Sequence, residues 1–148
     1  MFITPFRAEH VFDLEKIQAR QIPDFVLGTE WEPDAMMELE RKGMGYTLFD
    51  GKDAVVCAGV FSVWPQRAHA WMLAVAGWGD RVDLKMALKF AKEILASYPA
   101  RRIESTVLVD WAPGHVLMRH LGFKLEAKRL RCYDPEGRDF SLYARIRE

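Results

Sequence analysis

The pattern of apolar and polar positions divides the first third of the chain into a short strand and two helices. Residues 2–4 form an apolar run that a proline ends, which predicts a strand. In residues 9–19 an apolar side chain recurs every three positions, as on one side of a helix. A second helix is expected to start at Pro33, because proline suits the first helical position, and to close at Gly43.

The middle of the chain has the pattern of three β-strands. Residues 46–49 and 54–63 are rich in β-branched and aromatic side chains, and Asp50-Gly51 between them is a strong hairpin signal. A third strand is expected over residues 68–75, where large apolar side chains occupy alternate positions.

The clearest amphipathic helix of the sequence follows this third strand. It begins behind Asp83, a residue type that caps helix starts, and its apolar side chains are spaced by three and four positions with lysines on the other side. A strand over residues 103–109 and a short helix over 113–121 come next. Residues 124–133 and 140–146 are expected to form a closing hairpin.

The order of these elements predicts an α/β chain with a mixed sheet. Hairpins pair strands antiparallel, whereas the helical crossovers of the second half require a parallel pair. The 148 residues contain no repeat and no linker, so we expect one domain over residues 1–148. In the last strand, alternation predicts an inner face made of Phe140, Leu142, Ala144 and Ile146.

Composition and charge exclude several classes of function. The formal net charge is zero, and the acidic residues concentrate in residues 1–50, so the strong basic footprint of a nucleic-acid-binding protein is absent. No apolar run approaches the ~20 residues of a membrane span, and the first residues do not read as a signal peptide. Cys57 and Cys132 are expected to be reduced, buried thiols of a cytoplasmic protein, and a disulfide between them is the alternative.

The element order and the segment from Trp111 to Phe123 resemble the GNAT family of acyl-CoA-dependent N-acyltransferases. The segment is a short helix that ends in Leu-Gly-Phe, in which Gly122 would supply a left-handed cap and Phe123 would enter the core. The resemblance implies a mixed, mostly antiparallel central sheet flanked by about four helices. It also implies acetyl transfer from acetyl-CoA to an amine, by direct attack in a ternary complex.

The same resemblance implies where an acyl-CoA would bind. In the family the strand at residues 68–75 splays from the next strand, and its exposed backbone pairs with the pantetheine amides. The following helix start would present unpaired N–H groups to the diphosphate, and glycines would allow its close approach. The expected cofactor-binding residues are Leu73, Val75, Gly77, Trp78, Gly79, Arg81 and Val82.

Several departures from the family pattern favour an alternative function. Asp80 and Asp83 place negative charge where phosphates would lie, and the family's general-acid tyrosine falls on Met118, which has no proton to give. The Trp-rich strand and the altered loop resemble the divergent GNAT-like proteins of tailed phages. The alternative is therefore a catalytically inactive GNAT-fold structural or interaction protein, virion-associated in a phage.

Transfer to an amine needs a group that takes up a proton, and the candidates are Glu30, Asp110 and His115. Glu30 lies in the segment that lines the acceptor side in the family, and imidazole titrates in the range that suits a base. Each residue also has a simpler interpretation: Glu30 as solvated charge, Asp110 as a helix cap and His115 as a packing residue.

No metal is expected, because no histidine spacing matches a metal site.

The expected partners follow from the acyltransferase hypothesis and include an acyl-CoA. The acceptor would be an amine-bearing small molecule or protein. Whether the chain acts alone or as a homodimer is left open.

Overall fold

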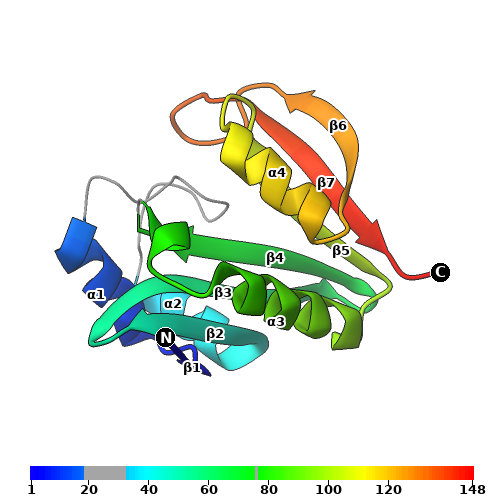
Figure 1. Cartoon of the computed structure of the whole chain (residues 1–148). Helices are drawn as coiled ribbons and strands as arrows, with labels where there is room; N and C mark the ends of the chain where they lie inside the picture. The colour runs from blue at the N-terminus through cyan, green and yellow to red at the C-terminus, as the bar shows by residue number, and fades with distance from the viewer. Residues whose placement is uncertain (19–32, 76) are drawn as a thin grey trace.

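The computed structural model describes residues 1–18, 33–75 and 77–148, and the strands of these residues form one seven-stranded sheet (Figure 1). Their order is β1-β2-β3-β4-β5-β7-β6, and within the described chain β4 and β5 are the one parallel pair, so the sheet is mixed and mostly antiparallel as predicted. The strands are β1 Phe2–Pro5, β2 Gly43–Asp50, β3 Asp53–Trp64, β4 Arg67–Ala74, β5 Arg102–Leu108, β6 Lys124–Leu130 and β7 Phe140–Ile146.

Two helices lie on each face of the sheet (Figure 1). On one face are α1 (Ala8–Gln18) and α2 (Pro33–Lys42), and on the other are α3 (Leu84–Ser97) and α4 (Ala112–His120). A short 3-10 helix, η1 (Trp78–Asp80), precedes α3. This is the predicted order of elements, and no helix of the described residues is long and apolar enough to cross a membrane.

The face toward α1 and α2 is closely packed. Val11 and Leu14 of α1 are 0% exposed and Met36 of α2 is 1% exposed. Trp71 of β4 lies on this face, in one cross-strand row with Gly59 of β3. Because a Cβ at Gly59 would lie 3.1 Å from the indole nitrogen, the missing side chain makes room for the Trp71 ring.

The end of α4 follows the predicted signature. Gly122 has a left-handed φ of 85°, and the backbone N–H of Phe123 donates to the carbonyl oxygen of Met118 at 3.0 Å. The side chain of Phe123 is 3% exposed, so it enters the core as expected.

α2 ends at Lys42, directly before Gly43 as predicted, but Gly43 is not a left-handed helix cap and instead starts β2. It is not among the residues with positive φ. A Cβ at Gly43 would lie 2.3 Å from the carbonyl oxygen of Val60, so glycine is required here by a close strand contact.

The predicted inner face of the last strand is also wrong. Ile146 is 44% exposed, whereas Tyr143, expected on the outer face, is 3% exposed. β7 lies between β5 and β6, and Tyr143 packs in the core cluster that α4 covers. Tyr143 and Ala144, successive residues that point to opposite faces of β7, are both 3% exposed, so this inner strand is buried on both faces and alternation alone does not identify one inner face.

The β6 strand is shorter than predicted, because it ends at Leu130. Cys132 follows with a left-handed φ of 51° and is exposed, so it is not the buried thiol that the sequence suggested. Cys57 is buried, and its burial raises the pKa of the thiol to about 12, which keeps it unreactive.

Candidate functional site

β4 and β5 are paired at one end only. Their register joins residues 67–69 to residues 102–104. Just beyond it, the Ser105 hydroxyl donates to the carbonyl oxygen of Ala70 at 3.1 Å. The two strands then run apart (Figure 1), as the splayed strands expected from the sequence should. We call the unpaired edges beyond Ala70 and Ser105 the β4–β5 opening, and the paired end its closed end.

Alternation along β4 decides which backbone groups face the β4–β5 opening. The N–H of Val75 donates to β3 at 3.0 Å, whereas the carbonyl of Ala70 points to β5. Because successive residues point their backbone groups to opposite sides, Leu73 also faces β3, and Met72 and Ala74 face the opening. Leu73 and Val75, the contacts expected from the sequence, are at most 1% exposed, so their side chains do not reach the opening either.

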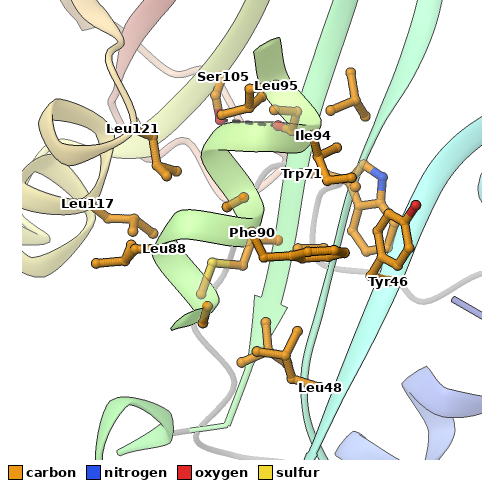
Figure 2. Close-up of a pocket in the computed structure, with 18 of the residues that line it drawn as sticks. Tyr46, Leu48, Trp71, Leu88, Phe90, Ile94, Leu95, Ser105, Leu117 and Leu121 are labelled. Atoms are coloured by element: carbon orange, nitrogen blue, oxygen red, sulfur yellow. Dashed lines mark hydrogen bonds between the residues drawn. The ribbon is translucent and has the colours of Figure 1, made fainter. Parts of the chain in front are cut away.

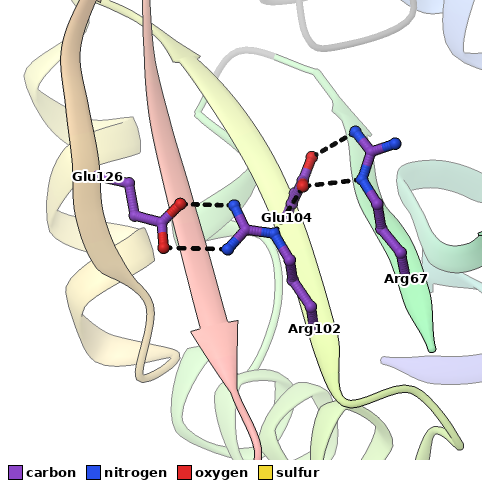
Figure 3. Close-up of polar contacts among 4 residues, drawn as sticks. All are labelled: Arg67, Arg102, Glu104 and Glu126. Atoms are coloured by element: carbon purple, nitrogen blue, oxygen red, sulfur yellow. Dashed lines mark hydrogen bonds and ion pairs between the residues drawn. The ribbon is translucent and has the colours of Figure 1, made fainter.

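A chain of ion pairs holds the closed end (Figure 3). Glu104 accepts from Nε and Nη2 of Arg67 at 2.8 and 2.9 Å and from Nε of Arg102 at 2.7 Å. Arg102 also donates to both carboxylate oxygens of Glu126 on β6. The hydrogen bonds from Arg67, then those from Arg102, lower the pKa of Glu104 to about 2. The carboxylate therefore links β4 to β5, while Arg102 extends the chain of ion pairs to β6, and with this pKa Glu104 is a poor proton acceptor.

His69 lies at the closed end on the face toward α1, in register with Glu104. Its ring is tilted against Phe61, with ring centroids 5.5 Å apart. Burial lowers the pKa of His69 to about 4, so the ring is neutral at neutral pH. Within the described part of the chain, three buried polar atoms on this face have no hydrogen-bond partner: His69 Nε2, Trp71 Nε1 and Thr106 Oγ1.

The loop between β4 and α3 keeps part of the expected anion-binding geometry. Gly77 has a left-handed φ of 72°, and a Cβ at Gly77 or Gly79 would meet no atom of the described chain within 4 Å. The backbone at both glycines is therefore open to a ligand. Trp78 and Val82 are partly buried against the core, so their side chains serve packing.

Arg81 points back to the β2–β3 hairpin. Its Nε donates to Asp50 and its Nη2 to Asp53, both at 3.0 Å. Asp83 caps α3 as predicted, because its carboxylate accepts a backbone N–H of the first turn at 3.1 Å. The charge of Arg81 is thus already neutralised, and Asp80 and Asp83 add negative charge beside the loop.

His115 anchors the start of α4. Its Nε2 lies 2.9 Å from the carbonyl oxygen of Val109 and 3.2 Å from that of Leu108, and its Nδ1 lies 2.6 Å from the Tyr143 hydroxyl. Carbonyl oxygens only accept, so in the neutral ring Nε2 carries the proton and Nδ1 accepts from Tyr143. This arrangement favours the packing interpretation of His115, since neither nitrogen is left for a substrate.

The other two candidate bases are placed differently. Asp110 is exposed in the turn before α4, and it is not the helix cap: Trp111 occupies that position without a capping side-chain hydrogen bond. Glu30 lies outside the described residues. Neither Asp110 nor His115 lines the cavity that adjoins the β4–β5 opening.

An apolar cavity of about 120 Å³ lies beneath α3 (Figure 2). On the sheet side it is lined by β2, β3 and β4, with Tyr46, Ala58 and Met72 as one cross-strand row. The helix side closes it with apolar side chains, namely Ala87, Leu88, Phe90, Ala91, Ile94 and Leu95 of α3, Leu117 and Met118 of α4, and Leu121 directly after α4.

Small side chains on both sides account for this cavity. Ala58 and Ala70 of the sheet lie under a helix that presents Ala87 and Ala91. As a result, the apolar stripe of α3 is not buried as a core stripe would be: within the helix Leu95 alone is fully buried. The spacing of apolar residues in the sequence indicates the apolar stripe of α3. The small residues opposite this stripe lie on β3 and β4, and only the fold brings them beneath the helix.

No protein-family model matches the sequence, and no curated protein matches it. Solved structures do match. The ribosomal-protein-S18-alanine N-acetyltransferase of Escherichia coli has a TM-score of 0.71 at 17% identity, over 98% of this chain and 92% of that one. RimJ of Mycobacterium smegmatis, solved with CoA-disulfide, has a TM-score of 0.68 at 16% identity, over 97% and 80%.

A third match names the fold. An acetyltransferase of the GNAT family from Streptococcus pneumoniae has a TM-score of 0.69 at 13% identity, over 99% of both chains. Identities this low establish the architecture alone. The mixed, mostly antiparallel sheet with two helices on each face is the GNAT fold, as the sequence resemblance implied.

Proposed function

We propose that this chain binds an acyl-CoA in the β4–β5 opening and transfers the acyl group to an amine. The observation that carries the proposal is the unpaired edge of β4, where Met72 and Ala74 present backbone groups to the opening. Pantetheine amides can pair with such an edge as an added strand would. The open backbone at Gly77 and Gly79 and the start of α3 follow directly, which suits a diphosphate. The neighbour solved with CoA-disulfide supports the assignment.

The proposed reaction is direct attack in a ternary complex. The nitrogen of a neutral amine adds to the thioester carbonyl, whose developing negative charge is stabilised by backbone N–H groups of β4. The intermediate then expels the CoA thiolate and forms an amide. Met118 cannot protonate this thiolate, so water does, which is feasible because thiols ionise at a pH of about 8.5.

The proton of the amine needs an acceptor as well. Among the described residues Glu104 is engaged by two arginines, and His69 is kept neutral by burial with a pKa of about 4. We therefore keep Glu30 and the exposed Asp110 as the proposed acceptors, acting through water. The substrate would be an amine-bearing small molecule or a protein amine, as the name of the E. coli neighbour indicates for that enzyme.

Calorimetric titration of CoA, acetyl-CoA and longer acyl-CoAs into the protein tests the proposal, together with an assay of CoA thiol release in the presence of amines. The diagnostic variant is Ala74→Pro, which removes one N–H that faces the β4–β5 opening and leaves the ladder to β3 intact. We expect it to weaken CoA binding about tenfold or more, which corresponds to ~1.4 kcal/mol, with an unchanged circular dichroism spectrum.

The same titration decides the second candidate function, a catalytically inactive structural or interaction protein, with a phage virion as its proposed setting. Met118 in place of an acid and the neutralised Arg81 favour this candidate. If neither CoA nor any acyl-CoA produces heat at millimolar concentration, the acyltransferase proposal fails. Binding without turnover for any amine would leave an inactive acyl-CoA-binding protein.

A further inference from the structure

We propose that the acyl donor is a medium-chain acyl-CoA of about six carbons, whose chain fills the cavity beneath α3. This inference rests on the proposed function and specifies its substrate class. An acetyl group would leave most of an apolar cavity of about 120 Å³ empty.

The cavity adjoins the β4–β5 opening. Ala70 and Ser105, which meet where the opening begins, line the cavity, as does Met72, whose backbone faces the opening. A pantetheine that runs along β4 from the Gly77 loop would bring its thioester to the point where the strands converge. The acyl chain would then enter the apolar cavity beneath α3, whose lining includes Tyr46 (Figure 2).

The chemistry of the lining suits an alkyl chain. No charged side chain of the described residues contributes to it, and the Ser105 hydroxyl is already satisfied by the carbonyl oxygen of Ala70. Tyr46 and Phe90 stand edge to face with ring centroids 4.8 Å apart and, with Leu48, limit the far end. A cavity of ~150 Å³ accepts benzene, so this one holds a chain of about five carbons beyond the thioester carbonyl.

The charges in the loop around η1 explain why the acyl chain would contribute strongly to the affinity for the acyl-CoA. Arg81 is paired with Asp50 and Asp53, and Asp80 and Asp83 lie nearby, so the diphosphate meets little free positive charge. The acyl chain is then the main source of affinity and of selectivity for the donor.

The test is a titration series with CoA and its acetyl, butyryl, hexanoyl and decanoyl thioesters. Each methylene buried in the cavity should lower Kd about fourfold, which is ~0.8 kcal/mol, up to the hexanoyl ester and no further. Equal affinities from acetyl to decanoyl would overturn this inference and leave the proposed function standing. An absence of binding by CoA and by every ester would instead overturn the proposed function.

Variants that fill the cavity make the test specific. Ala91→Phe should abolish the dependence on chain length while the Kd for acetyl-CoA stays within about twofold, since a phenyl ring replaces the ligand chain. The matched control is Ala96→Phe, at an exposed position of the same helix, which should keep the dependence. If Ala91→Phe does not fold, Ala58→Leu fills the cavity from the sheet. Hexanoyl-CoA binding as tight as in the wild type in either folded variant would contradict the proposal.

Discussion

The two faces of β3 and β4 are built differently, although the same strands supply both. Toward α1 and α2, the fully buried Val11 and Leu14 belong to one core cluster with Val55, Cys57 and Leu73 of these strands, which are at most 1% exposed. Toward α3, alanines face alanines and leave a cavity of about 120 Å³. One face therefore has the density of a protein core, and the other keeps room for a ligand.

This difference separates what holds the fold from what would bind a substrate. A closely packed face loses stability when any atom is removed, because the cavity left behind collapses only partly. A face that already has a cavity loses less on truncation and can gain when it is filled. Substitutions on the two faces should therefore have unequal effects on unfolding and on binding.

Truncation should give the largest contrast. Leu14→Ala removes a side chain that is 0% exposed in the packed face, and we expect the free energy of unfolding to fall by about 3 kcal/mol or more. Leu88→Ala, in the half-buried lining of the cavity, should cost about 1 kcal/mol. Urea denaturation at constant pH measures both, and equal losses would mean that the two faces are equally packed.

Acid should lower the free energy of unfolding in two steps, the first through His69 and the second through Glu104. Folding lowers the pKa of His69 from 6.5 to about 4, so the unfolded chain takes up this proton first and stability is lost as the pH falls from 6.5 to 4. Folding lowers the pKa of Glu104 from 4.5 to about 2, so its contribution is present above pH 4.5 and is lost between 4.5 and 2.

Each step could reach about 3 kcal/mol, from ~1.4 kcal/mol for one pKa unit. The measurement is the free energy of unfolding against pH for the wild type, His69→Gln and Glu104→Gln. His69→Gln should lack the step between pH 6.5 and 4, and Glu104→Gln should lack the lower one. A variant that keeps its step would show that another group titrates there.

The smallest difference between the two faces is expected when a larger side chain is introduced at two neighbouring residues. The larger side chain should destabilise the protein on one face, and on the other it should leave the stability unchanged or raise it. Gly59→Ala places a Cβ 2.5 Å from the carbonyl oxygen of Met44 and should destabilise by about 1–3 kcal/mol. Ala58→Leu, one residue away, projects into the cavity and should leave the melting temperature unchanged or raise it. A lower melting temperature for Ala58→Leu than for Gly59→Ala would contradict the assignment of faces.

Part of the candidate site could be predicted from the sequence. The glycine loop and the cap at Asp83 come from features within a few neighbouring residues, and the splayed strand was implied by the family resemblance; the structure has each of them where it was expected. The partners of Arg81 could not be predicted, since Asp50 and Asp53 lie 31 and 28 residues away and only the fold brings them to the loop.

What the sequence by itself determined is the type and order of the helices and strands, together with local features such as the left-handed Gly122. These depend on periodicity and on backbone conformation, which act over a few residues. Only the tertiary structure decided that Met72 and Ala74, rather than Leu73 and Val75, face the β4–β5 opening, and that alanines meet beneath α3. The reason is that a strand points successive residues to opposite sides, so only its pairing with neighbouring strands decides which residues face a ligand.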